Sequence, residues 1–505
     1  MEKSSGDRVE RMTADIDAIA KVPASLARLY RLVPLEIRAG ILRVATSDPA
    51  NAGALRDLEL SLKMKVQGVT CEPQYLDALL EQYYPEETAV LPRADFFDQI
   101  LAEEVQEEVE SLVSKPQILR LVHYLFSQAM TLQASDIHIE PSSTGSQIRY
   151  RVDGILHDFL FLPNKVALVV VTKLKVMADL NTSERRLPQD GSIKIFLNKR
   201  LIELRVSTLP TIFGESMVLR VLNREAVSLD LTRLGMAGTH LDRFRSFLAS
   251  PHGIILLTGP TGSGKTTTLY AALVELNTVG TKIITTEDPI EYDLDGIMQI
   301  EINPEIGLTF ASSLRAILRQ DPDIILVGEI RDIETAKVSI QAALTGHLVF
   351  STLHTRDAPS AIARLMDMGV EPYLIADTLI GVVAQRLIRK ICVECKTDFP
   401  VGPTESLHLK EFGLISDCLF YGKGCDACGM TGFRGRVSLY EMMPISPEIR
   451  EMITARQPLE QIRTAAHRTG MKMLREEGLR LVLEGITTLQ EVLESTSFEK
   501  EAGSA

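Results

Sequence analysis

The spacing of apolar and polar positions changes along the chain, and each change indicates a different kind of structure. Residues 22–85 combine a short apolar run of strand type, Gly40–Ala45, with a helical pattern at Tyr75–Tyr83. From about residue 235 to 385, short apolar runs alternate with helical patterns. This alternation is typical of a parallel sheet wrapped by helices. The pattern therefore predicts a large α/β domain in the middle of the chain and a smaller α/β domain near its start.

Between these two segments the pattern is mixed, with one helix followed by strands. The helical stretch Gln117–Ala134 leads into short segments in which apolar and polar residues alternate. These predicted strands are Asp136–Glu140, Gln147–Asp153, Ser192–Phe196, Arg200–Ser207 and Ser216–Leu222. Helical patterns also occur near the end of the chain, at Pro447–Thr454 and Leu459–Thr469. We therefore expect an α+β domain before the central α/β domain and a helical segment after it.

An acidic stretch separates the first two predicted domains. Between Asp95 and Glu110 lie seven acidic residues and no basic ones, a pattern typical of a solvated linker or helix face. The predicted organisation is an N-terminal domain at 1–90, the acidic linker at 91–116, the α+β domain at 117–225, the central domain at 235–385, a cysteine module at 386–440 and a helical end at 441–505.

The composition excludes several classes of protein. At 505 residues, with 45% apolar and 24% charged residues, the chain is typical of soluble globular proteins. Its 54 basic and 67 acidic residues give a formal charge of −13, which disfavours nucleic acid as a direct partner. The charged start lacks the apolar core of a secretory signal, and no apolar run approaches the roughly 20 residues that span a bilayer. We therefore expect a cytoplasmic protein that contacts a membrane only through a partner.

The strongest motif is GPTGSGKT at residues 259–266, which matches G-x-x-x-x-G-K-[ST]. A strand pattern, Gly253–Leu257, precedes it and a helical pattern, Thr267–Asn277, follows it, as a phosphate-binding loop requires. The glycines allow backbone N–H groups to surround a phosphate, Lys265 neutralises its charge and the Thr266 hydroxyl can ligate Mg²⁺. The predicted nucleotide-binding residues are Gly259, Pro260, Thr261, Gly262, Ser263, Gly264, Lys265, Thr266 and Thr267.

Two further strand patterns end in acidic residues. Glu329 comes after the apolar run at 324–327, and Glu287 follows the strand pattern at 282–286. Because the carboxyl ends of parallel strands form the ligand-binding edge of an open α/β sheet, both acids are expected near the phosphate loop. One of them can hold Mg²⁺ together with Thr266, for which Glu329 is the candidate, and one can orient the attacking water. Both are candidate catalytic residues, and the sequence leaves the division of roles open.

A fourth strand pattern, Leu348–Ser351, lies between two histidines. His354 follows the strand at the same sheet edge, so it is a candidate for sensing the terminal phosphate of a nucleotide. His347 precedes the strand, and we interpret it as a residue that braces the loop.

Four of the six cysteines form two C-x-x-C pairs. Cys392 and Cys395 are separated by 29 residues from Cys425 and Cys428. This is the spacing of a closed tetrahedral zinc site with four thiolate ligands. Since such a site leaves no coordination position open, the predicted role of the zinc is structural. The other two cysteines lie outside the pattern.

These motifs in combination point to one family. The matching segments are GPTGSGKTT at 259–267, TTEDPIEY at 285–292, LRAILRQDPDIILVGEIRD at 314–332, TGHLVFSTLHTRDA at 345–358, ASDIHIEP at 134–141, YRVDG at 150–154 and RRLPQDG at 185–191. Together they resemble the secretion ATPases of the type II secretion and type IV pilus assembly systems. The first four segments correspond to the Walker A, Asp-box, Walker B and His-box segments of that family.

The resemblance implies a RecA-like ATPase domain preceded by a PAS-like domain, assembled as a homohexamer with nucleotide bound between the two domains. It implies that arginines of the PAS-like domain reach the phosphates, within or between subunits, and the matching positions are Arg205 and Arg220. The cysteine module resembles that of the secretion and pilus assembly members. The N-terminal domain at 1–90 is expected to dock on the cytoplasmic part of an inner-membrane platform protein.

The function implied by the resemblance is Mg²⁺-dependent ATP hydrolysis that drives pseudopilus assembly and protein export by the type II secretion system. A type IV pilus assembly ATPase is the alternative, with the same chemistry in another machine. A nucleic-acid translocase and a scaffold that binds ATP without hydrolysing it are more remote alternatives. Residues 1–90 lack the paired R-L-G-x-x-L motifs of members that bind a cyclic dinucleotide, so no such regulation is expected.

Overall fold

The chain forms two compact units, residues 1–225 and 226–505, which are described separately below. The computed structural model describes residues 14–19, 21–38, 40–49, 52–62, 64–84, 113, 115–197, 200–222, 229–236 and 238–497. The acidic stretch between Asp95 and Glu110 lies outside these residues.

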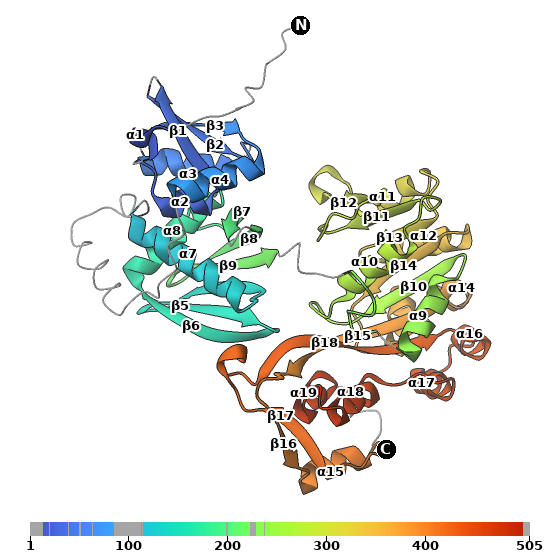
Figure 1. Cartoon of the computed structure of the whole chain (residues 1–505). Helices are drawn as coiled ribbons and strands as arrows, with labels where there is room; N and C mark the ends of the chain where they lie inside the picture. The colour runs from blue at the N-terminus through green and yellow to red at the C-terminus, as the bar shows by residue number, and fades with distance from the viewer. Residues whose placement is uncertain are drawn as a thin grey trace. The chain divides into compact units, whose positions relative to one another are not determined.

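The first unit begins with a three-stranded sheet and short helices (Figure 1). Strand β2 pairs with β1 in antiparallel and with β3 in parallel orientation. The elements are α1 Ile16–Ile19, α2 Ala24–Leu29, β1 Leu32–Arg38, β2 Ile41–Thr46, α3 Ala52–Leu62, β3 Lys65–Thr70 and α4 Pro73–Tyr83. The strand and the helix expected in this segment both form, within two residues of their predicted bounds.

The second part of this unit is a six-stranded antiparallel sheet in the order β6-β5-β4-β9-β8-β7. Its elements are α7 Pro116–Thr131, β4 Asp136–Pro141, β5 Gly145–Val152, β6 Ile155–Pro163, α8 Asn164–Met177, β7 Gln189–Leu197, β8 Arg200–Thr211 and β9 Gly214–Leu222. The five predicted strands form, whereas β6 and α8 are additional. Helix α8 is rich in valine, which favours strands, but most of its residues are buried, and tertiary packing supplies most of the stability of a helix in a protein.

The two parts of the first unit share one hydrophobic core. Helix α8 packs against α3 of the N-terminal part and against α7 and β5. At this contact Lys173 donates to both carboxylate oxygens of Asp57 at 2.6 Å, and the Tyr30 hydroxyl donates to Asp57 at 2.6 Å. Lys173 and Asp57 are both fully buried, so each compensates a charge that is costly to bury alone. The predicted boundary at residue 90 thus separates two segments that pack as one body.

The second unit is built on a seven-stranded sheet in the order β12-β11-β13-β14-β10-β15-β18. The first six strands are parallel and β18 is antiparallel to β15. The strands are β10 Gly253–Thr258, β11 Ile283–Glu287, β12 Met298–Glu301, β13 Ile324–Val327, β14 Leu348–Leu353, β15 Leu379–Ile391 and β18 Phe433–Pro444. The helices between them are α9 Thr239–Leu248, α10 Lys265–Leu276, α11 Phe310–Ile317, α12 Ile333–Leu344, α13 Pro359–Asp367 and α14 Pro372–Thr378, with a short 3₁₀ turn, η1 Pro304–Ile306.

Apolar side chains from both faces of this sheet form two core clusters, so the central strands are buried on both sides as a parallel sheet requires. The predicted α/β architecture with a parallel sheet is confirmed.

The cysteine module is an insertion between two paired strands of the main sheet. Residue 385 lies inside β15 and residue 440 lies inside β18, so the predicted bounds of the module cut through continuous strands. The inserted elements are β16 Lys396–Pro400, α15 Pro403–Lys410, β17 Cys418–Gly422 and η2 Asp426–Cys428, and the chain continues into α16 Pro447–Thr454, α17 Leu459–Arg468, α18 Leu474–Leu483 and α19 Leu489–Ser495. Because β15 and β18 pair along most of their length, the module is tied directly to the strand beside β10.

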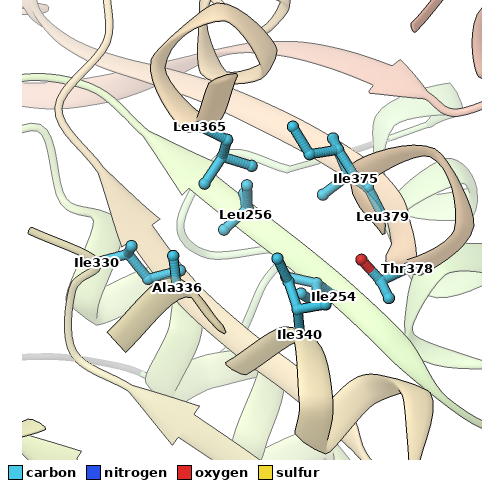
Figure 2. Close-up of a pocket in the computed structure, with 9 residues that line it drawn as sticks. All are labelled: Ile254, Leu256, Ile330, Ala336, Ile340, Leu365, Ile375, Thr378 and Leu379. Atoms are coloured by element: carbon cyan, nitrogen blue, oxygen red, sulfur yellow. The ribbon is translucent and has the colours of Figure 1, made fainter. Parts of the chain in front are cut away.

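A small cavity of about 10 Å³ lies between β10 and helices α12 to α14 (Figure 2). Its walls are almost entirely aliphatic; they are formed by Ile254, Leu256, Ile330, Ala336, Ile340, Leu365, Ile375, Thr378 and Leu379. A space of this size holds at most one water molecule, so it is a packing void and not a nucleotide pocket. Across the described residues, none of the helices has the length and apolar character needed to cross a bilayer.

Candidate nucleotide site and cysteine cluster

The phosphate loop lies between the end of β10 and the start of α10, as predicted. Two of its glycines are required by their surroundings. A Cβ atom on Gly259 would lie 2.5 Å from the carbonyl oxygen of Gln385, and one on Gly264 would lie 3.0 Å from the Gln385 side-chain nitrogen. Gly264 also has a φ of 84°, a left-handed conformation that glycine adopts without strain. The loop therefore packs closely on β15, and only glycine fits at these positions.

Lys265 begins α10 and is folded back onto its own loop. Its Nζ donates to the carbonyl oxygens of Gly259 and Pro260, both at 2.9 Å. Burial, and after it the charge of Arg386, lowers the pKa of Lys265 to about 8, against an opposing contribution from Glu329. Among the described residues, the hydrogen bonds of the ammonium group thus go to neutral oxygens, and another cation acts on it more strongly than the Glu329 carboxylate does. An anion at the loop would relieve this arrangement.

The loop also contains a polar group that lacks a partner. The Ser263 hydroxyl oxygen is buried and has no hydrogen-bond partner in the described structure. Buried polar groups are rarely left unsatisfied, and Gly262 next to it has open space where a Cβ would stand. Together with the folded-back lysine at the N-terminus of α10, these features fit a phosphate group in the loop.

Glu329 and His354 are brought together at the ends of neighbouring strands β13 and β14. The Glu329 carboxylate lies 2.5 Å from the guanidinium of Arg331 and 3.6 Å from Nε2 of His354. The side chain of Glu329 is 13% exposed and that of His354 is 52% exposed. Glu329 is also close enough to Lys265 to act on its pKa. The structure therefore places Glu329, His354 and Lys265 in one charged region, in which Lys265 is buried and His354 is exposed.

Glu287, the last residue of β11, has a different environment. It is 3% exposed, and side chains donate hydrogen bonds to both of its carboxylate oxygens. The Tyr270 hydroxyl donates to Oε2, whereas Thr285 donates to Oε1 at 2.5 Å and Gln299 Nε2 donates to Oε1 at 3.1 Å. The predicted strand end is correct, but the side chain of Glu287 lies under α10, which carries Tyr270.

The loop that follows β14 is anchored at both ends. Next to His354, the hydroxyls of Thr355 and Thr258 are 2.5 Å apart, and the Thr355 N–H donates to Thr258 Oγ1 at 2.9 Å. Further on, Asp357 forms an ion pair of 2.8 Å with Arg463 of α17. These contacts connect the loop that carries His354 to the residue before the phosphate loop and to the C-terminal helices.

His347, at the other end of β14, lies with its Nδ1 2.8 Å from the carbonyl oxygen of Ala342. This contact joins the start of β14 to the end of α12.

Arg205 and Arg220 belong to the first unit and lie directly opposite each other on β8 and β9. Arg220 donates from Nε to Asp136 of β4 at 3.1 Å, and its side chain is 60% exposed. Like charges directly opposite each other destabilise a pair of strands. The two predicted arginines are therefore adjacent on one sheet, and the Asp136 carboxylate already compensates part of the charge of Arg220.

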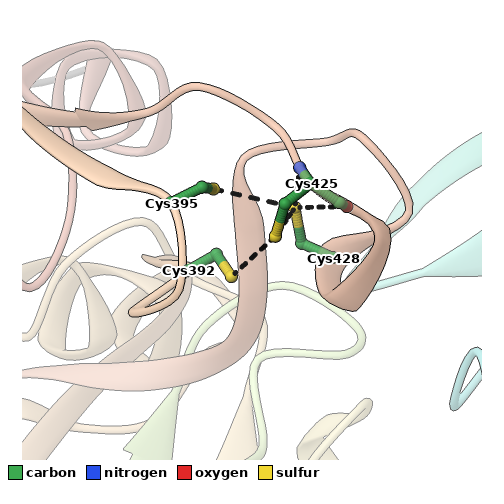
Figure 3. A group of neighbouring side chains, drawn as sticks. All are labelled: Cys392, Cys395, Cys425 and Cys428. Carbon is green, nitrogen blue, oxygen red and sulfur yellow. Dashed lines mark hydrogen bonds between the residues drawn. The ribbon is translucent and has the colours of Figure 1, made fainter.

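The four predicted cysteines come together in one cluster (Figure 3). Their sulfur atoms all lie within 4.8 Å of one another, and the Sγ–Sγ separations of Cys392–Cys425, Cys395–Cys428 and Cys425–Cys428 are 3.9, 3.9 and 3.7 Å. Four sulfurs in a tetrahedron around zinc, each about 2.3 Å from the metal, are about 3.8 Å apart. Cys428 also accepts N–H bonds from Cys425 and Gly432 at 3.2 and 3.3 Å, which favours a thiolate. The cluster therefore fits a zinc ion.

The family described as type II/IV secretion system protein matches residues 111–494. The chain belongs to this family. A second family, the MshEN domain, matches residues 8–90, so the secretion-family segment and the MshEN segment together account for most of the chain.

Curated relatives of this secretion family member carry two kinds of name. The chain is 40% identical to the type II secretion system ATPase E of Vibrio cholerae over 96% of this chain and 98% of that protein. It is also 40% identical to the type IV pilus assembly ATPase PilB of Myxococcus xanthus, over 96% of this chain and 87% of that protein. Among solved structures, the pilus retraction motor PilT with bound ADP is similar, with 26% identity and a TM-score of 0.52 over 75% of this chain and 98% of that one. The expected membership is confirmed, and the named relatives are ATPases.

Sequence reasoning did not identify Tyr270, Gln299 and Arg463 as part of the site of this family member. Tyr270 lies in the apolar interior of α10 and has the sequence pattern of a core residue. Gln299 and Arg463 have the pattern of surface residues, and nothing in their spacing links them to Glu287 or Asp357. Only the packing of α10, β12 and α17 reveals these contacts.

Proposed function

We propose that this ATPase family member binds ATP at the phosphate loop and hydrolyses it in a Mg²⁺-dependent reaction. The observation that carries the proposal is the state of Lys265, whose buried ammonium is destabilised by the charge of Arg386 and, among the described residues, donates hydrogen bonds to carbonyl oxygens of its own loop. A phosphate group would take the place of these carbonyls. The partnerless Ser263 hydroxyl and the open space at Gly262 support the same ligand.

In this proposal the residues divide into three tasks. Lys265 and the backbone N–H groups of residues 259–267 hold the phosphates. Glu329 and Thr266 would hold Mg²⁺, which when bound neutralises charge on the phosphate oxygens. Glu287 orients the attacking water and takes up its proton, while His354, next to Glu329, responds to the terminal phosphate.

Arg205 and Arg220 are proposed as further phosphate ligands. Their cross-strand pairing places the two residues directly opposite each other on one sheet. Guanidinium groups can bind a phosphate through two N–H donors each, and cations that meet the transferred phosphate often accelerate the reaction by about 10³-fold or more. Whether they act within one subunit or between subunits is left to experiment.

We further propose that the chain forms a homohexamer that couples hydrolysis to pseudopilus assembly and protein export in type II secretion. The similarity to type II secretion system ATPase E over nearly the full length of both chains supports this process. Pilus assembly is the second candidate because the pilus assembly ATPase of Myxococcus xanthus is equally similar. In either process, residues 1–90 dock on the cytoplasmic part of an inner-membrane platform protein, and the ATPase reaches the inner membrane only through that partner.

The test of hydrolysis uses the purified full chain with Lys265→Ala and Glu329→Gln variants. We expect phosphate release to fall by about 100-fold or more in both, since each loses a charge that faces the reacting phosphates. Lys337→Ala, which removes an exposed lysine on α12, is the matched control and keeps the original rate. Unchanged turnover in Lys265→Ala would contradict the proposed site.

A further inference from the structure

Glu287 is held by a network that joins three elements of the sheet. Tyr270 of α10 and Gln299 of β12 both contact the carboxylate, and Gln299 Nε2 also lies 3.5 Å from the Tyr270 hydroxyl oxygen. The backbone N–H of Glu291, in the segment after Glu287, donates to the same hydroxyl at 3.3 Å. Tyr270 is therefore the point at which α10, β12 and the segment that follows β11 meet.

The hydroxyl of Tyr270 is well suited to hold a carboxylate. Burial, and after it the hydrogen bond to Glu287, raises the pKa of Tyr270 well above its usual value, so the hydroxyl keeps its proton and remains a donor. Hydrogen bonds to an ionised acceptor are roughly twice as strong as those between neutral groups. A buried carboxylate without such donors is strongly disfavoured. The orientation of Glu287 thus depends on Tyr270.

Tyr270 also connects Glu287 to the phosphate loop. It lies five residues after Lys265 on the same helix, which is about one and a half turns or roughly 7.5 Å along the axis. Helix α10 begins at the residues that surround the phosphates. Any shift of the helix on nucleotide binding is therefore passed directly to the Glu287 carboxylate.

We propose that Tyr270 is a positioning residue for the hydrolysis reaction: its hydroxyl fixes the Glu287 carboxylate relative to the helix that begins at the phosphate loop. Gln299 supports the same orientation from β12. This inference rests on the proposed function, in which Glu287 orients the attacking water. It assigns Tyr270 no contact with the nucleotide.

The test compares Tyr270→Phe with Tyr292→Phe in the full-length protein. The two rings form a T-shaped contact with their centroids 6.0 Å apart, but of the two only Tyr270 bonds to Glu287 in the described structure. For Tyr270→Phe we expect kcat to fall by about tenfold to 100-fold, as for other small misplacements of reacting groups, with KM within about twofold of the original. Tyr292→Phe should keep both constants. Wild-type kcat in Tyr270→Phe, or an equal loss in both variants, would overturn the proposal.

A double-mutant cycle with Glu287→Gln separates positioning from general structural support. Hydrolysis is followed in single-turnover experiments with excess enzyme, so that slow rates remain measurable. If Tyr270 acts through Glu287, Tyr270→Phe lowers the rate in the original protein but not in Glu287→Gln. An equal loss in both backgrounds would show a role in structure alone. Wild-type rates in Glu287→Gln itself would instead refute the proposed role of Glu287.

Discussion

Glu287 and Glu329 follow two adjacent parallel strands of one sheet, and their surroundings are opposite in character. Glu329 is partly exposed and is surrounded by ionisable groups, with Arg331 at 2.5 Å and His354 at 3.6 Å. Glu287 is almost completely buried and bonded to three neutral side chains, those of Tyr270, Thr285 and Gln299. A carboxylate in an open, charged region can exchange partners, for instance a metal ion for an arginine. A carboxylate held by three donors keeps one orientation.

The comparison assigns the two acids different tasks although their sequence contexts are alike. The open Glu329 is suited to hold Mg²⁺, and the fixed Glu287 is suited to orient a water molecule. We therefore propose, from burial and hydrogen bonding, the division of roles that the sequence leaves open.

The largest expected effect separates the two acids by their response to magnesium. Glu287→Gln should lower kcat by about 10²- to 10⁴-fold, the usual contribution of a general base, without changing the Mg²⁺ concentration that gives half-maximal rate. Glu329→Gln should lower the rate and also raise that concentration. The measurement is a titration of ATP hydrolysis with Mg²⁺ in each variant. The assigned roles are wrong if Glu287→Gln, and not Glu329→Gln, shifts the magnesium dependence.

Removal of metal from the cysteine cluster should affect stability but neither acid. A metal ion would bridge the four thiols of two segments that backbone hydrogen bonds already bring together. Its loss should therefore lower the melting temperature by about 5 °C or more, which corresponds to about 2 kcal/mol or more for a unit of this size. Nucleotide affinity should stay the same, since the cluster is an insertion between β15 and β18. Thermal melting and nucleotide titration after verified removal with a chelator provide the check. An unchanged melting temperature counts against a structural role for the metal.

The ion pair between Asp357 and Arg463 should stabilise the loop that carries His354 and thereby the region of Glu329. It is largely buried, with side chains 7% and 17% exposed, so Arg463→Met should lower the free energy of unfolding by about 3 kcal/mol. The pair of Arg468 with Glu448 is of similar length but is 67% and 49% exposed. Arg468→Met is therefore the control, with an expected change below about 1 kcal/mol. Equal losses of unfolding free energy in the two variants, measured by chemical denaturation, would show that burial does not strengthen the pair of Asp357 and Arg463.

The smallest expected effect is a change of ADP affinity with pH, and it tests the charged surroundings that Glu329 shares with Lys265. Because Lys265 has a pKa of about 8 in place of 10.5, it is largely neutral above pH 8 in the free protein. A bound phosphate favours the charged form, so ADP binding should take up a proton there, and affinity should fall by up to about tenfold per pH unit above pH 8. Below pH 7 the lysine is charged in both states and contributes no dependence.

Calorimetric titration with ADP at pH 7 and pH 9, in two buffers of different ionisation enthalpy, measures this proton uptake. Lys265→Ala is the control, in which the additional fall of ADP affinity between pH 7 and pH 9 should be lost. If ADP affinity still falls as steeply with pH in that variant, another group is responsible for the pH dependence.

Much of the second unit was predictable from sequence because its apolar strands are short, fully buried and bounded by motif residues. The same signal located the ends of β11 and β13 and thus both acids. It did not reveal their environments, since Tyr270 has the pattern of a core residue. The pairing of β15 with β18 was also missed, because more than 40 residues, including the cysteine module, separate the two strands.

In the first unit, the buried ion pair could not be predicted from the sequence. Lys173 and Asp57 have the sequence pattern of surface residues, yet they form the buried contact that joins the N-terminal segment to α8. The valines of α8 favour a strand locally, and tertiary packing overrides that preference. Neither feature was predicted, because burial is a property of the assembled elements and cannot be read from local spacing.

The central claim, that ATP hydrolysis by this chain drives protein export, is tested most directly in the source bacterium. Lys265→Ala is introduced on the chromosome, and proteins are quantified in the medium, the periplasm and the surface-pilus fraction. The account predicts exported proteins retained in the periplasm, with pili intact. Loss of pili with normal export would contradict it and assign the chain to pilus assembly.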